Sequence, residues 1–162
     1  MNSDLNFFLN NREAIKNLQL DIGEDGTSNF KKICTASEIT LNTEFEQKDF
    51  YVWCDAIQRS ILTGAALDME TTVKTDMLNP AIQNVFGAVA DLIAKGEIAK
   101  FNNRTVRFEL VNGIEDGVLT YKTFEVPCVL SLSDLGGAAE DENGFTLDIV
   151  FNGKGKEVAP SV

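Results

Sequence analysis

The sequence predicts a mainly β fold: a β-sandwich or strongly curled antiparallel sheet of about seven strands, with one α-helix packed on it. Three observations lead to this expectation. Residues 60–75 alternate between small or apolar and polar side chains, the two-residue period of a strand with one wet face. Residues 79–96 carry a strong helix pattern. Short turns at 23–27 and 113–117, rich in Gly, Asp and Glu, join neighbouring strand patterns into antiparallel hairpins.

The helix pattern has clear ends. Asn79 is placed to cap it, and Pro80 suits the first turn, where a backbone N–H is not needed. Lys95 falls in the last turn, and Gly96 fits the left-handed position just beyond it. Six apolar residues repeat at spacings of three and four, so we expect them to lie on the sheet: Ile82, Val85, Phe86, Val89, Leu92 and Ile93.

The remaining strands follow from the same alternation. The ranges are 18–22, 30–33, 39–45, 98–112, 121–132 and 145–151. Pro127 cannot donate a ladder hydrogen bond, which predicts an edge or a bulge at that point. Residues 46–49 are expected to interrupt the strand pattern, and residues 50–54 are apolar on both faces. Such a segment is predicted to be buried on both sides, within the monomer or against a neighbour.

We expect one domain over residues 1–162. It would have an N-terminal arm at 1–14, an extended loop at about 46–59 and a mobile C-terminal tail at about 153–162. The N-terminus lacks the pattern of a secretory signal, and no apolar run approaches the roughly 20 residues that span a bilayer. We therefore expect a protein made in the cytoplasm, with no membrane insertion.

The composition argues against several functional classes. Fourteen basic and 25 acidic residues give a net charge of −11, the wrong sign for gripping nucleic acid by its phosphates. The sequence has no histidine, so neither a histidine-containing triad nor a histidine metal site can form. The three cysteines are far apart and are expected to be buried, reduced thiols.

No motif for catalysis or cofactor binding was found. Asp68 and Glu70 lie two residues apart on one predicted strand face, an arrangement typical of a wet surface more than of an acid–base pair. The acidic segment 134–144 lacks the spacing of a calcium loop and is expected to be a solvated loop. We predict no catalytic residue, no metal and no cofactor.

The order of these parts resembles the major tail (tail tube) proteins of long-tailed bacteriophages. The resemblance covers roughly residues 17–154 and rests on arrangement, since none of the segments is a signature alone. The segments are the strand with Leu62-Thr63-Gly64, the capped helix from Asn79-Pro80 to Gly96, the turn 112–117, the strand leading to 128–137 and the final strand 145–153. Residues 46–59 stand where the family has a long excursion.

The resemblance implies a structural virion protein of the tail, made in the host cytoplasm, and not an enzyme. Its subunits would form rings, commonly of six, that stack into a tube while their sheets join into one large β-barrel. The implied partners are other copies of the chain, the tape-measure protein, the tail terminator and baseplate or tail-tip proteins. DNA would pass through the channel without specific binding, which an acidic wall favours.

On this resemblance, candidate residues follow for two surfaces. The acidic residues expected to face the lumen are Asp68, Glu70, Glu109, Glu125 and Asp148. The alternative places these residues on the outer surface. The residues expected at contacts between subunits or rings are Phe7, Phe8, Phe50, Tyr51 and Trp53. The alternative places these five in the monomer's own core.

Rival functions stay open at this point. One is a secretion-system tube protein of related fold. Another is a monomeric β-sandwich binding module, which would stay monomeric at high concentration and show a cleft lined by aromatic residues. A hydrolase that uses the carboxylates is the most distant alternative.

Overall fold

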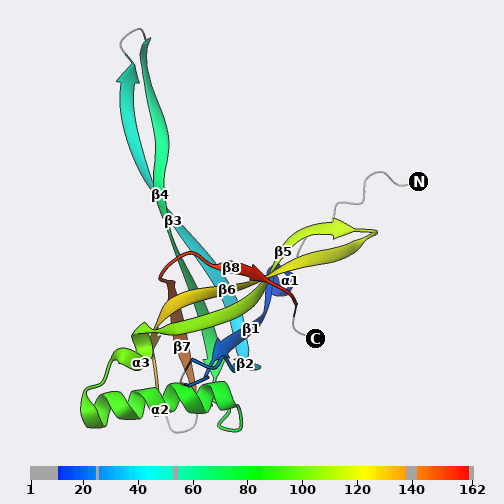
Figure 1. The fold of residues 1–162 in the computed structure, drawn as a ribbon, viewed down its shortest axis with the longest axis vertical. Coiled ribbons are helices and arrows are strands. Elements are labelled where there is room, and N and C mark those ends of the chain that lie inside the picture. Colours follow the sequence, from blue (N-terminus) through cyan, green and yellow to red (C-terminus); the bar gives the residue numbers. More distant parts are fainter. Residues whose placement is uncertain (1–10, 25, 53–54, 138–141, 161–162) are drawn as a thin grey trace.

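A computed structural model describes residues 11–24, 26–52, 55–137 and 142–160. In these ranges the chain forms eight strands and one long helix, α2, with two four-residue helices, α1 and α3 (Figure 1). The helices are α1 (Asn11–Ala14), α2 (Pro80–Lys95) and α3 (Ala99–Asn102). The strands are β1 (Ile15–Asp21), β2 (Phe30–Lys32), β3 (Ala36–Val52), β4 (Asp55–Lys74), β5 (Arg104–Glu115), β6 (Val118–Ser133), β7 (Gly144–Phe151) and β8 (Lys156–Val158).

All strands belong to one antiparallel sheet, which confirms the predicted fold class in its curled-sheet form. The strand order is β2-β1-β5-β6-β7-β4-β3, and β8 pairs with β6. Although β2 and β3 stand at opposite ends of this order, only residues 33–35 separate them in the chain. The N–H of Ile33 donates to the carbonyl of Leu18 on β1 (2.9 Å), while the carbonyl of Thr35 accepts from the N–H of Lys74 on β4 (3.5 Å). The sheet therefore curls until its two ends meet at this short link, although β2 and β3 do not pair.

The concave side of the curl holds the core. On β4, Met69 and Val73 are buried while Asp68 and Glu70 lie on the other face, which confirms the alternation predicted from the sequence. Neighbouring strands contribute Val106, Cys128, Leu130, Leu147 and Ile149 to the same core. The turn between β5 and β6 is shorter than the predicted 113–117, because β5 continues to Glu115; it consists of Asp116 and Gly117, both with positive φ, at 50° and 78°.

Helix α2 lies across one end of the curled sheet (Figure 1). The predicted cap is confirmed, since Asn79 Oδ1 accepts from the N–H of Ala81 (2.9 Å) and Gly96 has φ 66°. Ile82 and Val85 are buried, and the ring of Phe86 meets Phe145 edge-on at 5.9 Å. The last turn was predicted wrongly: Leu92 is 40% exposed and Ile93 is 81% exposed. That turn extends beyond the strand ends, so no sheet surface is left for it to cover.

Several other expectations about local structure were wrong. Residues 99–102 form α3 instead of the start of a strand, and residues 46–49 continue β3 instead of interrupting it. The C-terminal tail includes β8, whose three residues pair with β6. By contrast, the predicted edge at Pro127 is confirmed locally: the pairing of β6 with β8 ends at Glu125 and its pairing with β7 begins at Cys128, so Pro127 has no ladder partner on this side. Its carbonyl accepts from the N–H of Asn152 (2.8 Å).

Asn79 joins the helix to the sheet, because its Nδ2 also donates to the carbonyl of Lys32 at the end of β2 (2.9 Å). Asn79→Ala removes both bonds from a side chain that is nearly fully buried. We expect it to lower the free energy of unfolding by about 2 kcal/mol. Asn79→Ser keeps a capping oxygen but cannot make both bonds, so it should lower the free energy of unfolding by less than Asn79→Ala does. Urea unfolding, followed by circular dichroism, measures the stability of both variants. Equal losses of stability in the two variants would contradict the role of Asn79 in both the helix cap and the bond to β2.

Candidate assembly surfaces

The hairpin formed by β3 and β4 is the most prominent feature outside the core. Its outer half projects far from the body (Figure 1), and the ladder continues out to the pair Val52 and Asp55. This half exposes a set of large apolar side chains, which are Phe45, Phe50, Tyr51, Ile57, Ile61 and Leu62. Large apolar side chains seldom form an exposed patch on a monomer, and such a patch usually marks a surface that binds a partner.

Two of the residues predicted for subunit contacts can be placed on this hairpin. Phe50 is 37% exposed and Tyr51 is 69% exposed, so the alternative that they complete the monomer's core is wrong. Their role in subunit contacts stays a prediction. Phe7, Phe8 and Trp53 lie outside the described residues.

A bulge lies where the hairpin leaves the body. The ladder pairs Glu46 with Gly64 and then Gln47 with Leu62, so Thr63 is an extra residue on β4. Beyond the bulge, Ile61 and Leu62 lie on opposite faces of the hairpin, and so do Phe50 and Tyr51. The hairpin therefore carries exposed apolar side chains on both faces, interspersed with polar ones.

Three of the predicted lumen residues lie together on the outer face of the sheet. Glu70 on β4 is directly opposite Asp148 on β7, and Asp68 is two residues along from Glu70 on the same face. Asn42 Nδ2 donates to Asp68 Oδ2 (3.3 Å), whereas no ion pair in the described part of the chain involves Glu70 or Asp148. Like charges directly opposite each other on neighbouring strands destabilise a sheet. We call these three residues the acidic face.

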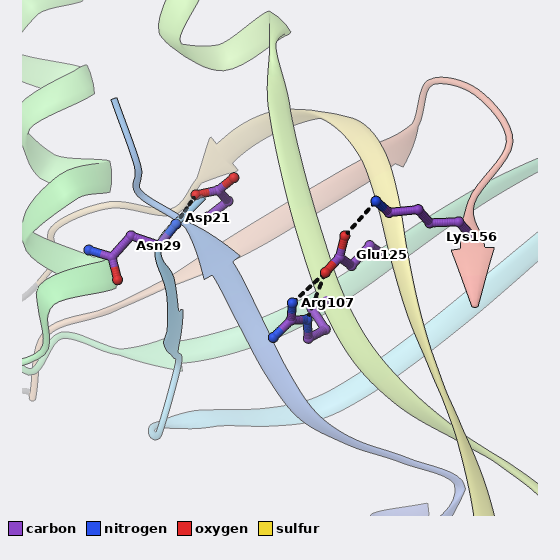
Figure 2. Close-up of polar contacts among 5 residues, drawn as sticks. All are labelled: Asp21, Asn29, Arg107, Glu125 and Lys156. Atoms are coloured by element: carbon purple, nitrogen blue, oxygen red, sulfur yellow. Dashed lines mark hydrogen bonds and ion pairs between the residues drawn. The ribbon is translucent and has the colours of Figure 1, made fainter. Parts of the chain in front are cut away.

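The other two predicted lumen residues are neutralised by nearby cations and lie on β5 and β6. Glu109 accepts from Asn17 Nδ2 (2.6 Å), and Lys16 Nζ lies 3.9 Å from it. Glu125 accepts from Arg107, whose Nε lies 3.1 Å from Oε1, while Lys156 Nζ lies 3.4 Å from Oε2 (Figure 2). The two carboxylates are only 17% and 13% exposed. The five acidic residues therefore separate into the acidic face and an ion-paired group.

The ion-paired group links several strands. Arg107 on β5 stacks on the ring of Phe30 on β2, with 4.0 Å between the guanidinium carbon and the ring centre. Figure 2 shows Arg107 and Lys156 reaching Glu125 from either side. Burial raises the pKa of Glu125, but the hydrogen bonds and charges of Arg107 and Lys156 outweigh burial and hold that pKa below its ordinary value. The sequence alternation could not reveal this pairing, because a register shift between Val111 and Gly113 sets which residues of β5 and β6 face each other, and Lys156 comes from β8.

The described residues show little that suggests chemistry. No three or more Asp, Glu, Cys or His side chains among them gather as metal ligands would. In the acidic loop, Glu142 pairs with Lys74 (2.9 Å), while Glu140 and Asp141 lie outside the described residues. Cys34 is exposed, contrary to expectation, and Cys128 is buried. Within the described ranges, no helix has the length and apolar character needed to cross a bilayer.

The depressed pKa of Glu125 predicts a pH dependence of stability. The pKa of this carboxyl is lower in the folded state than in the unfolded chain, where a Glu has a pKa of about 4.3. The carboxylate therefore stabilises the fold at pH values above the unfolded pKa. This stabilisation is lost as the pH falls through the pKa of the folded state. Glu125→Gln should lower the free energy of unfolding at pH 7 by about 1–3 kcal/mol and flatten its decline in acid. Urea unfolding between neutral and acidic pH measures both effects. Glu70→Gln is the matched control, because it removes an exposed carboxylate that lies opposite Asp148, and it should not lower stability at pH 7.

Comparisons with known proteins give matches by structure alone. No family model matches the sequence, and neither does any curated protein. Among solved structures, a chain in the tail of the empty gene transfer agent (GTA) particle, refined helically with C6 symmetry, aligns with a TM-score of 0.56 and 15% identity. That alignment covers 94% of this chain and 100% of the other.

Two further solved structures have a similar fold. A chain of the native GTA virion aligns with a TM-score of 0.57 and 13% identity, covering 88% of this chain and 96% of the other. The SPP1 tail tube aligns with a TM-score of 0.55 and 10% identity, covering 90% of this chain and 76% of that one. At these identities the likeness concerns the fold. The chain therefore has the fold of bacteriophage tail tube proteins, as the order of its sequence elements indicated.

Proposed function

We propose that this protein is the structural subunit of a phage-type tail tube. Its copies form rings of six that stack into a hollow tube, and DNA leaves the particle through the channel. The observation that carries the proposal is the likeness, over nearly the full length of both chains, to a chain of a helically refined tail with C6 symmetry. Such a tube acts through its shape and surface, so no enzymatic activity is part of the proposal.

The exposed hairpin supports this proposal. A long hairpin with Phe50 and Ile61 on one face and Tyr51 and Leu62 on the other is an aggregation hazard in a free monomer. Contacts between copies would cover both faces at once, because a subunit in a stack of rings has neighbours beside it and along the axis. We assign the hairpin, with Phe50, Tyr51 and Trp53, to these contacts. Phe7 and Phe8 are proposed for them from the sequence alone.

The acidic face supports the channel part of the proposal. Glu70 and Asp148 lie opposite each other, and no ion pair among the described residues includes either of them. Their repulsion costs folding free energy, so a function of this surface explains the pair better than stability does. A wall of carboxylates repels phosphates, so DNA would slide past it without sticking. We assign Asp68, Glu70 and Asp148 to the lumen. Glu109 and Glu125 hold strands together through their cations, and we propose no lumen role for them.

The proposal also sets location and partners. The protein would reside in the tail of the virion after synthesis in the host cytoplasm. Its main partner would be itself, and a tube also needs a tape-measure protein inside it, a terminator at one end and baseplate or tip proteins at the other. A chain of the anti-feeding prophage baseplate, a six-fold symmetrised structure, has the same fold with a TM-score of 0.52 and 9% identity, which supports the link to tail ends.

Removing the aromatic rings of the hairpin tests this proposal. Phe50→Ala combined with Tyr51→Ala should raise the protein concentration needed for tube growth at least about tenfold, because each buried aromatic contributes more than about 1.4 kcal/mol at an interface. The monomer's stability should not change, because both side chains are exposed on the hairpin. Light scattering follows growth, and urea unfolding follows stability.

Gln58→Ala is the matched control, since Gln58 lies opposite Tyr51 on the same hairpin and is exposed. It should assemble like the original protein. Trp53→Ala should behave like the double variant. Normal growth of the double variant would contradict the assigned role of the hairpin, and loss of its fold would place the two rings in the core.

A further inference from the structure

A hollow of about 360 Å³ lies on the side of the molecule where α2 and α3 meet the loop after β1. Its polar lining includes Asn84 from α2, Lys100 from α3 and Arg104 from the start of β5. Small residues of the two helices, among them Gly87 and Ala99, leave the space open. The hollow is distinct from both the acidic face and the hairpin, and the proposed function makes no use of it.

Arg104 is the unusual member of this lining. Its side chain is partly buried, and burial lowers the pKa of its guanidinium. Nη2 donates to Asn84 Oδ1, but Nε is buried without any hydrogen-bond partner in the described structure. The ion pairs of the described residues do not include Arg104, whereas Arg107 three residues later is paired with Glu125.

Nearby groups do not complete the pairing of Arg104. Cys128 lies directly across the ladder, but burial raises the pKa of its thiol to about 12, so it stays neutral. Asp21 attracts the guanidinium, but its Oδ1 already accepts from the N–H groups of Gly23 (2.9 Å) and Asn29 (2.8 Å). Glu24 also lines the hollow, but no described bond joins it to the guanidinium. A partly buried cation without a carboxylate is costly.

We propose that this hollow is a binding site for a carboxylate, held by the guanidinium of Arg104 with help from the amide of Asn84. Lys100 also lines the hollow, but its ammonium is already paired with Asp91. A guanidinium offers a planar fork of donors that matches a carboxylate, and the open space beside Gly87 admits one. Two sources share this chemistry. One is an acidic side chain of a second copy in the assembled tube, a source that rests on the proposed function. The other is a free small carboxylate.

Gly87 offers a way to block the hollow without touching its polar groups. A Cβ at Gly87 would meet nothing within 4 Å, and Leu is a much better helix former than Gly. Gly87→Leu should therefore fold at least as well as the original protein while filling the space. Ala90→Leu is the matched control, because Ala90 is exposed on the same helix but does not line the hollow.

The probe is sodium acetate, compared with sodium chloride at the same concentration, on the dispersed full-length protein. Acetate should shift the side-chain Nε–H signal of Arg104 in the NMR spectrum and raise the thermal unfolding temperature. Gly87→Leu should weaken acetate binding at least about tenfold, and Ala90→Leu should leave it unchanged. An Arg104 signal that responds equally to acetate and chloride would overturn the proposal, as would equal acetate binding in all three proteins.

Assembly then separates the two sources. If a second copy supplies the carboxylate, Gly87→Leu should need a higher protein concentration than Ala90→Leu to form tubes. If the ligand is a free carboxylate, both variants should assemble alike while only Gly87→Leu loses acetate binding. Failure of every variant to form tubes would count against the proposed function and would leave the acetate result standing.

Discussion

The structure depends on the burial of one face of a single curled sheet. Alternation in β4 places Met69 and Val73 inside and Asp68 and Glu70 outside, and the three residues between β2 and β3 bring the ends of the sheet together. Helix α2 then closes one end of the curl, with Asn79 bonded to both the helix and β2. With the inner face filled, the outer half of the β3–β4 hairpin keeps large apolar side chains exposed among the described residues.

This division gives the molecule three kinds of surface with different physical properties. The body is held by its core and by ion pairs such as Arg107 with Glu125. The hairpin beyond the bulge at Thr63 has a complete backbone ladder but apolar side chains on both faces, so its free energy falls when copies cover it. The acidic face resists contact with any polyanion. On the proposed function, a subunit that stacks around a channel would use all three surfaces.

Much of the fold followed from local patterns, and the failures have physical causes. The caps of α2, the Asp116–Gly117 turn and the alternation in β4 were predictable because each depends on a few adjacent residues. Leu92 and Ile93 carry a core pattern but extend past the sheet, which only the lengths of distant strands decide. The pairing of Glu125 with Arg107 and Lys156 was missed because it depends on the register shift between Val111 and Gly113 and on the placement of β8. Alternation identified Asp68, Glu70 and Asp148 as outward-facing, but only the strand register placed Glu70 opposite Asp148.

Cryo-electron microscopy of the purified full-length protein across a concentration series tests the central claim most directly. The account predicts hollow tubes built from rings of six, with Asp68, Glu70 and Asp148 lining the channel and the β3–β4 hairpin buried between copies. Tubes with the acidic face outside would contradict the lumen assignment. A protein that remains a dispersed monomer at high concentration, even after a tail-initiator complex is added, would contradict the tube itself.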